Sequence, residues 1–115
     1  MAGLAARDAL YRDTVRVADR ARGWFDGPGA AWRARQPAAV QALVAVESLA
    51  ITTRLLAVMS WLLDPRQGEG LPAFAAPECG DMAADHPLRA VPGGAIALAS
   101  RALVARAVAL SGDVA

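Results

Sequence analysis

Apolar positions are densest between Pro37 and Leu63, a stretch in which only Glu47 and Arg54 carry charge. At about 100° per residue its polar side chains fall into three separate arcs, and apolar residues fill the space between them. A helix with that pattern has no wide polar face and is expected to be buried nearly all round. The pattern therefore predicts a central helix over about 37–63. Pro37 suits its first turn, where the missing N–H is not needed.

An amphipathic pattern over about 4–25 predicts the first helix, with apolar side chains on one continuous arc and Asp and Arg side chains opposite. The segment Asp26-Gly27-Pro28-Gly29 is expected to end this helix, because Gly permits a left-handed cap and Pro cannot continue the helix. A short connector that can itself be helical follows over 30–36, with Trp32 as its anchor in the core.

The third helix is expected over about 94–111, where Ile96, Leu103 and Leu110 recur every seven residues. That spacing predicts a narrow seam suited to antiparallel packing on another helix. Between the second and third helices, over about 65–93, five prolines and several glycines replace the periodic pattern. This connector either stays mobile or folds over the helices through its apolar side chains, namely Leu71, Phe74, Met82 and Leu88.

Together these elements predict an all-α fold, in which a single domain over 1–115 forms a three-helix bundle. The central helix would be largely buried, and a long Pro/Gly-rich connector would join helices two and three. Composition agrees, because Ala is the commonest residue and the best helix former, and strand-like clusters of β-branched and aromatic residues are absent. Membrane insertion is not expected, because Glu47 and Arg54 near the middle of the central helix would each cost about 2.5–3.5 kcal/mol.

The net charge is +1, from 12 basic residues that are all Arg and 11 acidic residues. Such a balance does not favour nucleic acid or an anionic membrane as a partner. Cys79 is the only cysteine, which excludes an internal disulfide. The first residues lack the uninterrupted apolar stretch of a secretory signal, and Asp8 and Asp13 are atypical of transit peptides. The expected compartment is the cytoplasm.

The segment Glu78-Cys79-Gly80-Asp81, followed by Asp85-His86, contains residue types that bind zinc. Its spacing matches no recurrent zinc pattern, so a polar loop is the favoured interpretation. His86 has no nucleophile in a fixed relation to it. No catalytic, cofactor-binding or metal-binding residue is therefore assigned, and no cofactor is expected.

Glu47 and Arg54 share a face of the central helix about 10 Å apart along its axis, which is too far for an easy direct pair. Both are expected to be substantially buried, and buried charges need partners. The structural interpretation gives each a partner on another helix, such as Arg106 for Glu47, or on the backbone. The binding interpretation pairs either charge with a partner protein, and in a two-fold homodimer Glu47 would meet Arg54 of the second chain. Thr53 and Trp61 complete the set of polar positions with a structural or interaction role.

Several segments resemble the RcdA-like family, which is named for a bacterial regulator of the degradation of the cell-cycle factor CtrA. The matching residues are Tyr11, Phe25-Asp26-Gly27-Pro28-Gly29, Glu47-Ser48-Leu49, Thr52-Thr53-Arg54-Leu55 and Met59-Ser60-Trp61-Leu62-Leu63. The likeness is strong over about 11–63, weak over the third helix and absent from 65 to about 89.

The resemblance implies a three-helix bundle, usually dimeric, that has no enzymatic activity and serves as an adaptor delivering substrates to the ClpXP protease. The implied partners are protease components or substrates, and a second copy of the chain. Two departures limit this transfer. The connector is rich in Pro and Gly where the family has further helical sequence, and the sequence runs only a few residues past the third helix, where a long flexible tail can recruit partners.

A function of a different class uses the first helix. Arg12, Arg16 and Arg20 lie in a row along it, and such a row can contact phosphates in a small helical DNA-associated regulator. Aspartates lie between these arginines, and the chain shows no helix-turn-helix pattern, so the row is more typical of a solvated outer face. Salt-dependent DNA binding is the observation that would favour the regulator.

Overall fold

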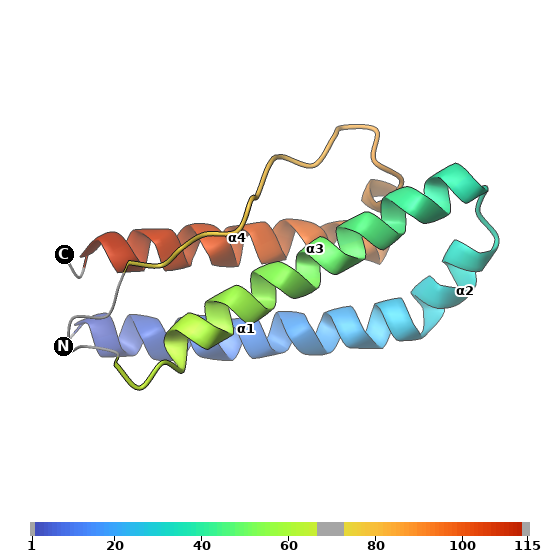
Figure 1. The fold of residues 1–115 in the computed structure, drawn as a ribbon. Coiled ribbons are helices and arrows are strands. Elements are labelled where there is room, and N and C mark those ends of the chain that lie inside the picture. Colours follow the sequence, from blue (N-terminus) through green and yellow to red (C-terminus); the bar gives the residue numbers. More distant parts are fainter. Residues whose placement is uncertain (1, 67–72, 114–115) are drawn as a thin grey trace.

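The computed structural model describes residues 2–66 and 73–113, and these residues form four α-helices, one 3-10 helix and no strand (Figure 1). The class is all-α, as the sequence predicts. In chain order the elements are α1 (Ala2–Asp26), α2 (Pro28–Ala34), α3 (Ala38–Leu62), η1 (Pro87–Ala90) and α4 (Pro92–Asp113).

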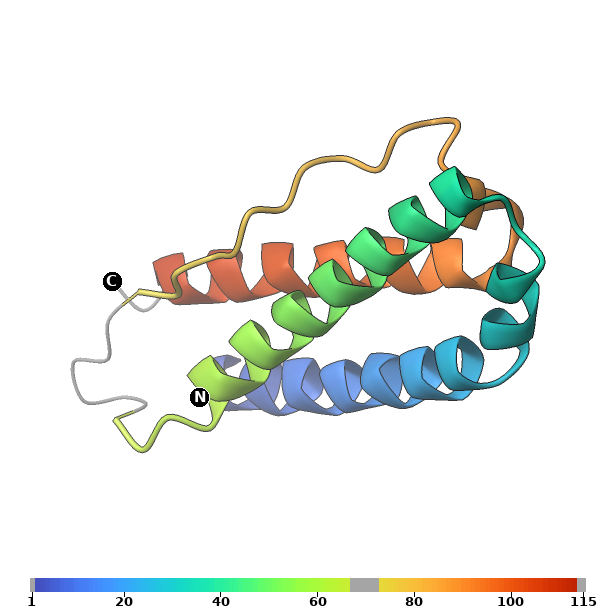
Figure 2. The same cartoon turned by 45° about the vertical axis from the view of Figure 1, so that its right-hand side comes forward.

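The three long helices pack on one another in an elongated molecule of 49 × 23 × 19 Å. α1 and α4 lie side by side and run in opposite directions, while α3 crosses both obliquely (Figures 1 and 2). α1 packs more extensively on α4 than on α3. The oblique crossing therefore leaves α1 and α3 splayed apart over part of their length.

The described residues form a fourth α-helix besides the three expected ones, because the short connector after the first helix, which was expected to be able to form a helix, forms α2. Pro28 lies in the first turn of α2, where its missing N–H is not needed. The turn between α1 and α2 is tight: a Cβ on Gly29 would lie 2.6 Å from the ring of Trp24. Trp32 of α2 anchors this end of the molecule, with its ring centroid 6.0 Å from that of Trp24.

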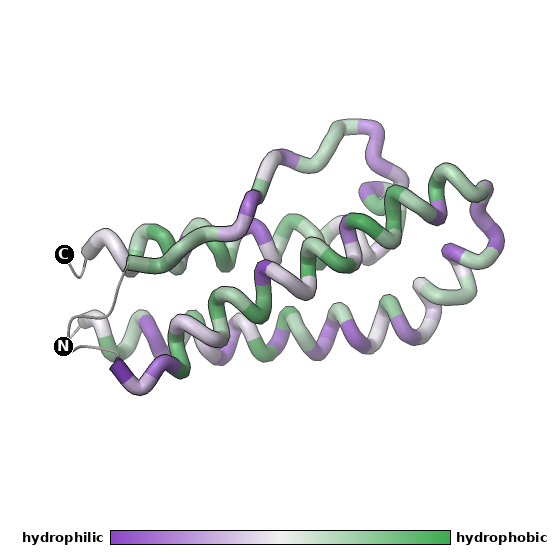
Figure 3. Tube along the Cα trace, viewed as in Figure 1, coloured by the Kyte–Doolittle hydropathy of each residue, from purple (hydrophilic) through white to green (hydrophobic). Residues whose placement is uncertain are grey.

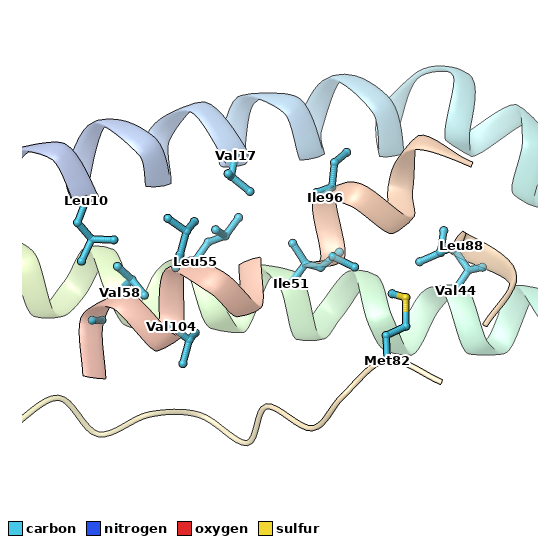
Figure 4. Close-up of a cluster of buried hydrophobic side chains, with 13 residues drawn as sticks. Leu10, Val17, Val44, Ile51, Leu55, Val58, Met82, Leu88, Ile96 and Val104 are labelled. Atoms are coloured by element: carbon cyan, nitrogen blue, oxygen red, sulfur yellow. The ribbon is translucent and has the colours of Figure 1, made fainter. Parts of the chain in front are cut away.

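The core lies between α1, α3 and α4, and its apolar side chains point toward one another in Figure 4. Ile96 and Leu103 of the expected seven-residue seam are buried, while Leu110 is half-buried. Hydrophilic residues recur along α1 and are scarce in α3 and α4 (Figure 3). Buried core residues of the three long helices are Leu10, Val17, Val44, Ile51, Leu55, Val58, Ile96, Ala97, Leu103, Val104 and Ala107.

The described part of the connector folds over α3 and α4. Residues 73–83 run as extended chain across these helices, and a turn at 84–85 leads into η1 (Figure 2). Phe74 packs edge-on against Trp61 of α3 with 5.6 Å between ring centroids, and its amide donates to Ser111 Oγ of α4 at 2.7 Å. Met82 and Leu88 are buried. Leu71, the fourth apolar residue expected to act here, lies outside the described residues.

The expectation that the central helix is buried nearly all round is wrong for the single chain. Val46 is 71% exposed, Leu49 69% and Leu56 58%, and Thr53 and Ser60 are also exposed. The reason is geometric: α1, α4 and the connector together contact α3 only from its other sides, and no element of the described chain covers these residues. α3 therefore presents a wide outward face that contains no charge.

Candidate functional site

Two guanidinium groups hold the buried carboxylate of Glu47. Arg54 Nη1 donates to Glu47 Oε2 at 2.7 Å. Arg101 of α4 donates through Nη1 to Oε2 at 2.9 Å and through Nη2 to Oε1 at 3.0 Å. Arg54 Nη1 also donates to Ser100 Oγ at 3.2 Å. Glu47, Arg54 and Arg101 are called the ion cluster below.

The structure corrects two expectations about these charges. Glu47 and Arg54 were expected to lie too far apart for a direct pair, but both side chains are long, share one face of α3 and extend toward each other. Arg106 was one candidate partner of Glu47 within the chain. It donates instead to Asp13 Oδ2 on α1 at 2.8 Å. The partner that sequence reasoning missed is Arg101, and the available signal was a second arginine within the apolar sequence of α4.

The charge balance of the ion cluster favours an ionised Glu47. Burial disfavours the charged carboxylate, but hydrogen bonds from Arg101 and Arg54 outweigh burial and place the pKa of Glu47 below its ordinary value. Arg54 is 4% exposed, and its Nε has no hydrogen-bond partner among the described residues. One carboxylate therefore compensates two guanidinium groups, which makes Glu47 the member that the other two depend on.

Arg101 extends the ion cluster to the connector. Its Nε donates to the carbonyl of Gly80 at 2.8 Å, and its Nη1 also donates to the carbonyl of Ala97 at 3.1 Å. A second arginine, Arg89, holds the same stretch through the carbonyls of Met82 at 2.6 Å and Ala83 at 2.7 Å. The ion cluster thus joins α3, α4 and the connector in one hydrogen-bonded network.

Because both charges of α3 point into the ion cluster, its outward side is left with uncharged residues only. We call this surface the outer α3 face. Its residues recur every seven positions along one side of the helix, a spacing that lets a partner helix pack against them. Its members, all exposed, are Ala42, Val46, Leu49, Thr53, Leu56 and Ser60.

The two other predicted positions take different places. Thr53 lies on the outer α3 face, and its hydroxyl donates to the carbonyl of Leu49 at 3.1 Å. Trp61 lies in the last turn of α3, half-buried against Phe74. The structure therefore brings Glu47 and Arg54 together but places Thr53 on a different, exposed side of the helix.

An open groove of about 330 Å3 lies where α1 and α3 are splayed apart. We call it the α1–α3 groove. Its lining is mainly apolar, and charged or hydroxyl side chains stand at its walls. The residues that matter below are Arg22, Phe25 and Asp26 from α1 and Ile51, Thr52 and Leu55 from α3.

The segment that contains Cys79 and His86 is a loop with a structural role. His86 Nδ1 accepts a hydrogen bond from the amide of Leu88 at 3.1 Å and so caps η1. Cys79 is half-buried as a free thiol. Across residues 2–66 and 73–113, no three His, Cys, Asp or Glu side chains are grouped closely enough to hold a metal ion.

Two helices, Ala38–Leu62 and Pro92–Gly112, are long and apolar enough to cross a membrane by length and composition alone. The core helices of soluble proteins meet the same criterion. Here both helices contribute to one shared core and carry the ion cluster between them. Both helices therefore pack within one compact helical molecule.

The profile of the family DUF1465, described as a protein of unknown function, matches residues 4–76. That range covers more than half of the chain. The protein belongs to the DUF1465 family. RcdA is a member of the same family. The matched range contains α1 except its first two residues, α2 and α3, and thus Glu47 and Arg54, whereas α4 with Arg101 lies beyond it. No curated protein and no solved structure matches the chain.

Proposed function

We propose that this DUF1465 protein is a non-enzymatic interaction adaptor that acts in the cytoplasm in regulated proteolysis of the ClpXP type and in cell-cycle control. Its partners are protease components or their substrates. Membership of the family to which RcdA also belongs supports the direction of this proposal. The sequence likeness to RcdA-like proteins over about 11–63 is the reason for proposing regulated proteolysis and cell-cycle control as the process.

The observation that carries the proposal is the outer α3 face. In a soluble helix the charges normally face water and the large apolar side chains face the core. α3 reverses this order, because Glu47 and Arg54 are buried while Val46 and Leu49 are about 70% exposed. Contiguous exposed apolar surface marks sites of protein interaction. A surface without charge also imposes no desolvation cost on ionic groups when a partner covers it.

Self-association is part of the proposal, and the outer α3 face is its natural interface. A two-fold contact is self-complementary, so an uncharged face meets its own copy without like-charge repulsion. The expected cross-chain pair between Glu47 and Arg54 loses its basis, because these two side chains satisfy each other within one chain. A homodimer would therefore rest on packing of residues such as Leu49 and Leu56, not on ion pairs.

A DNA-associated regulator is the second candidate, and the exposed row Arg12, Arg16 and Arg20 on α1 is the observation that favours it. Arg16 pairs with Asp13 at 3.3 Å, and Asp13 also binds Arg106. These carboxylate contacts reduce the positive potential that a phosphate backbone would meet. DNA binding whose affinity falls steeply with salt would support this second candidate.

The adaptor proposal is tested in two steps. First, tagged protein is purified from its native host, and the co-purified proteins are compared between the parent and Leu49→Glu. Second, proteins that depend on Leu49 are incubated with purified ClpXP, with and without the adaptor. We expect their degradation to accelerate when the parent is present and not when Leu49→Glu is present. Equal degradation rates under all three conditions would contradict the proposal.

A further inference from the structure

The connector packs against one side of α3, and the open α1–α3 groove lies on another side. Residues 73–83 cross the side between α3 and α4 as an extended segment (Figure 2). Phe74 packs against Trp61, Met82 is 5% exposed, and Arg101 Nε donates to the Gly80 carbonyl at 2.8 Å. The structure thus shows how α3 accommodates an extended segment: apolar side chains enter between the helices while a guanidinium group binds a backbone carbonyl.

The α1–α3 groove offers the same combination and is open. Phe25, Ile51 and Leu55 give it an apolar lining. Arg22 stands at its α1 wall with an exposed side chain. Among the described residues Arg22 has no ion-pair partner, so its guanidinium is available to donate to a carbonyl.

The walls of the groove also supply hydrogen-bond acceptors. The Thr52 hydroxyl gives its proton to the carbonyl of Ser48 at 3.2 Å, which leaves the lone pairs of Thr52 Oγ1 for an incoming donor. Asp26 is exposed and has no ion-pair partner among the described residues. Extended backbone carries unpaired N–H and C=O groups, whereas a helix satisfies its own. A donor on the α1 wall and acceptors on both walls therefore suit an extended segment better than a helix.

From these contacts we infer that the α1–α3 groove is the docking site for an extended, apolar segment of a client protein. Arg22 donates to carbonyls of the segment, while Thr52 and Asp26 accept from its amides. The inference rests on the proposed adaptor function. It adds that the adaptor holds a client by such an extended segment. The groove volume of about 330 Å3 fits a few side chains, since it lies at the small end of the ~300–1,000 Å3 typical of ligand sites.

The test uses the purified full chain and a random dodecapeptide library displayed on phage. Peptides selected on the parent are titrated against Thr52→Trp and its matched control Thr53→Trp. Both threonines are exposed, and both donate to the carbonyl four residues earlier, but only Thr52 lines the groove. A second pair compares Arg22→Gln with Arg12→Gln, which removes a charge from the outer side of α1.

We expect selected peptides to be apolar and to bind Thr52→Trp at least about tenfold more weakly than the parent. Thr53→Trp and Arg12→Gln should change the affinity less than about twofold, and Arg22→Gln should weaken it by about five- to tenfold. Selection of no peptide above background overturns the inference. So does retention of full affinity by Thr52→Trp, or equal loss in Thr52→Trp and Thr53→Trp, which would place the peptides on the outer α3 face.

The two proposals fail separately. Peptide binding is measured on the protein alone, without a protease or a client. If Thr52→Trp accelerates the degradation of clients by ClpXP as much as the parent does, relative to ClpXP alone, the groove inference fails while the adaptor function stands. If peptides bind the groove and no client is degraded faster with the parent, the groove stands and the adaptor function fails.

Discussion

Glu47 and Arg54, seven residues apart on α3, form a 2.7 Å ion pair on the buried side of that helix. Arg101 of α4 binds the same carboxylate from the other side. This arrangement places the charges of α3 inside the molecule and leaves the outer α3 face to uncharged residues. The orientation of α3 thus determines both which of its residues join the core and the ion cluster and which form the surface proposed for partners.

Two adjacent leucines show that α3 is buried on one side and exposed on another. Leu55 is 6% exposed and Leu56 is 58% exposed. Leu55→Ala should destabilise the protein by about 2–5 kcal/mol, because it removes a buried side chain and leaves a cavity. Leu56→Ala should cost less than about 0.5 kcal/mol. Urea unfolding of the two variants checks this pair of values, and similar losses in both would contradict the orientation of α3.

Removal of the Glu47 charge should be costly, because it leaves two guanidinium groups close together without a counter-charge. We expect Glu47→Gln to lower the free energy of unfolding by about 3–5 kcal/mol. Asp13→Asn is the control: it also breaks an ion pair with an arginine, Arg106, but Asp13 is accessible to solvent. That control should shift the urea midpoint only slightly. Equal shifts would show that the ion cluster does not stabilise the core.

Acid should weaken the contribution of Glu47. Its pKa in the folded protein is below the ordinary value of 4.5, because Arg101 and Arg54 donate to the carboxylate. A carboxyl group with a lowered folded pKa stabilises the protein fully above its unfolded pKa and loses that effect as the pH falls through the folded pKa.

The corresponding measurement compares the unfolding free energy of the parent and Glu47→Gln from neutral pH down to about pH 3. The difference should stay constant down to about 4.5 and then shrink. Asp13 and Asp64 also have lowered pKa values, but both are present in the two proteins, so the comparison isolates Glu47. A difference that grows with acidity would contradict the sign of the effect.

Amide exchange should separate α3 from the connector. The amides of residues 75–85 have no backbone acceptor among the described residues, so they should exchange quickly, while the buried turns of α3 exchange slowly. Phe74 is the expected exception, because its N–H donates to Ser111 Oγ. Ser111→Ala should abolish that protection. Slow exchange throughout 75–85 would reveal a more closely bound segment than these contacts support.

The helical class and the extents of the long helices follow from local patterns, and α1, α3 and α4 begin and end within a few residues of the predicted positions. Local periodicity is sufficient there because apolar spacing and the Pro and Gly residues act within a few turns. The same logic overlooked that Pro28 can start a new helix directly after α1 ends. The prediction treated Asp26–Gly29 only as a stop.

The orientation of α3 could not be predicted in the same way. The sequence predicts that Glu47 and Arg54 are buried, and both are. It predicts no outward side for α3, whereas in the structure threonine, serine, alanine and large apolar side chains face outward. The partners that Glu47 and Arg54 find on α4 are Arg101 for Glu47 and Ser100 for Arg54, which lie 54 and 46 residues away in sequence. Contacts at these separations leave no periodic signal in either helix. The ion cluster therefore became visible only when the helices were placed together.

Protein half-lives across the proteome of the native host test the central claim most directly, namely that the protein promotes proteolysis through the outer α3 face. A deletion strain is complemented with the parent, with Leu49→Glu or with Leu4→Glu, which adds the same charge at an exposed leucine of α1. We predict that deletion lengthens the half-lives of a defined set of proteins, and that the parent and Leu4→Glu restore them while Leu49→Glu does not. Unchanged half-lives after deletion, or full restoration by Leu49→Glu, would contradict the claim.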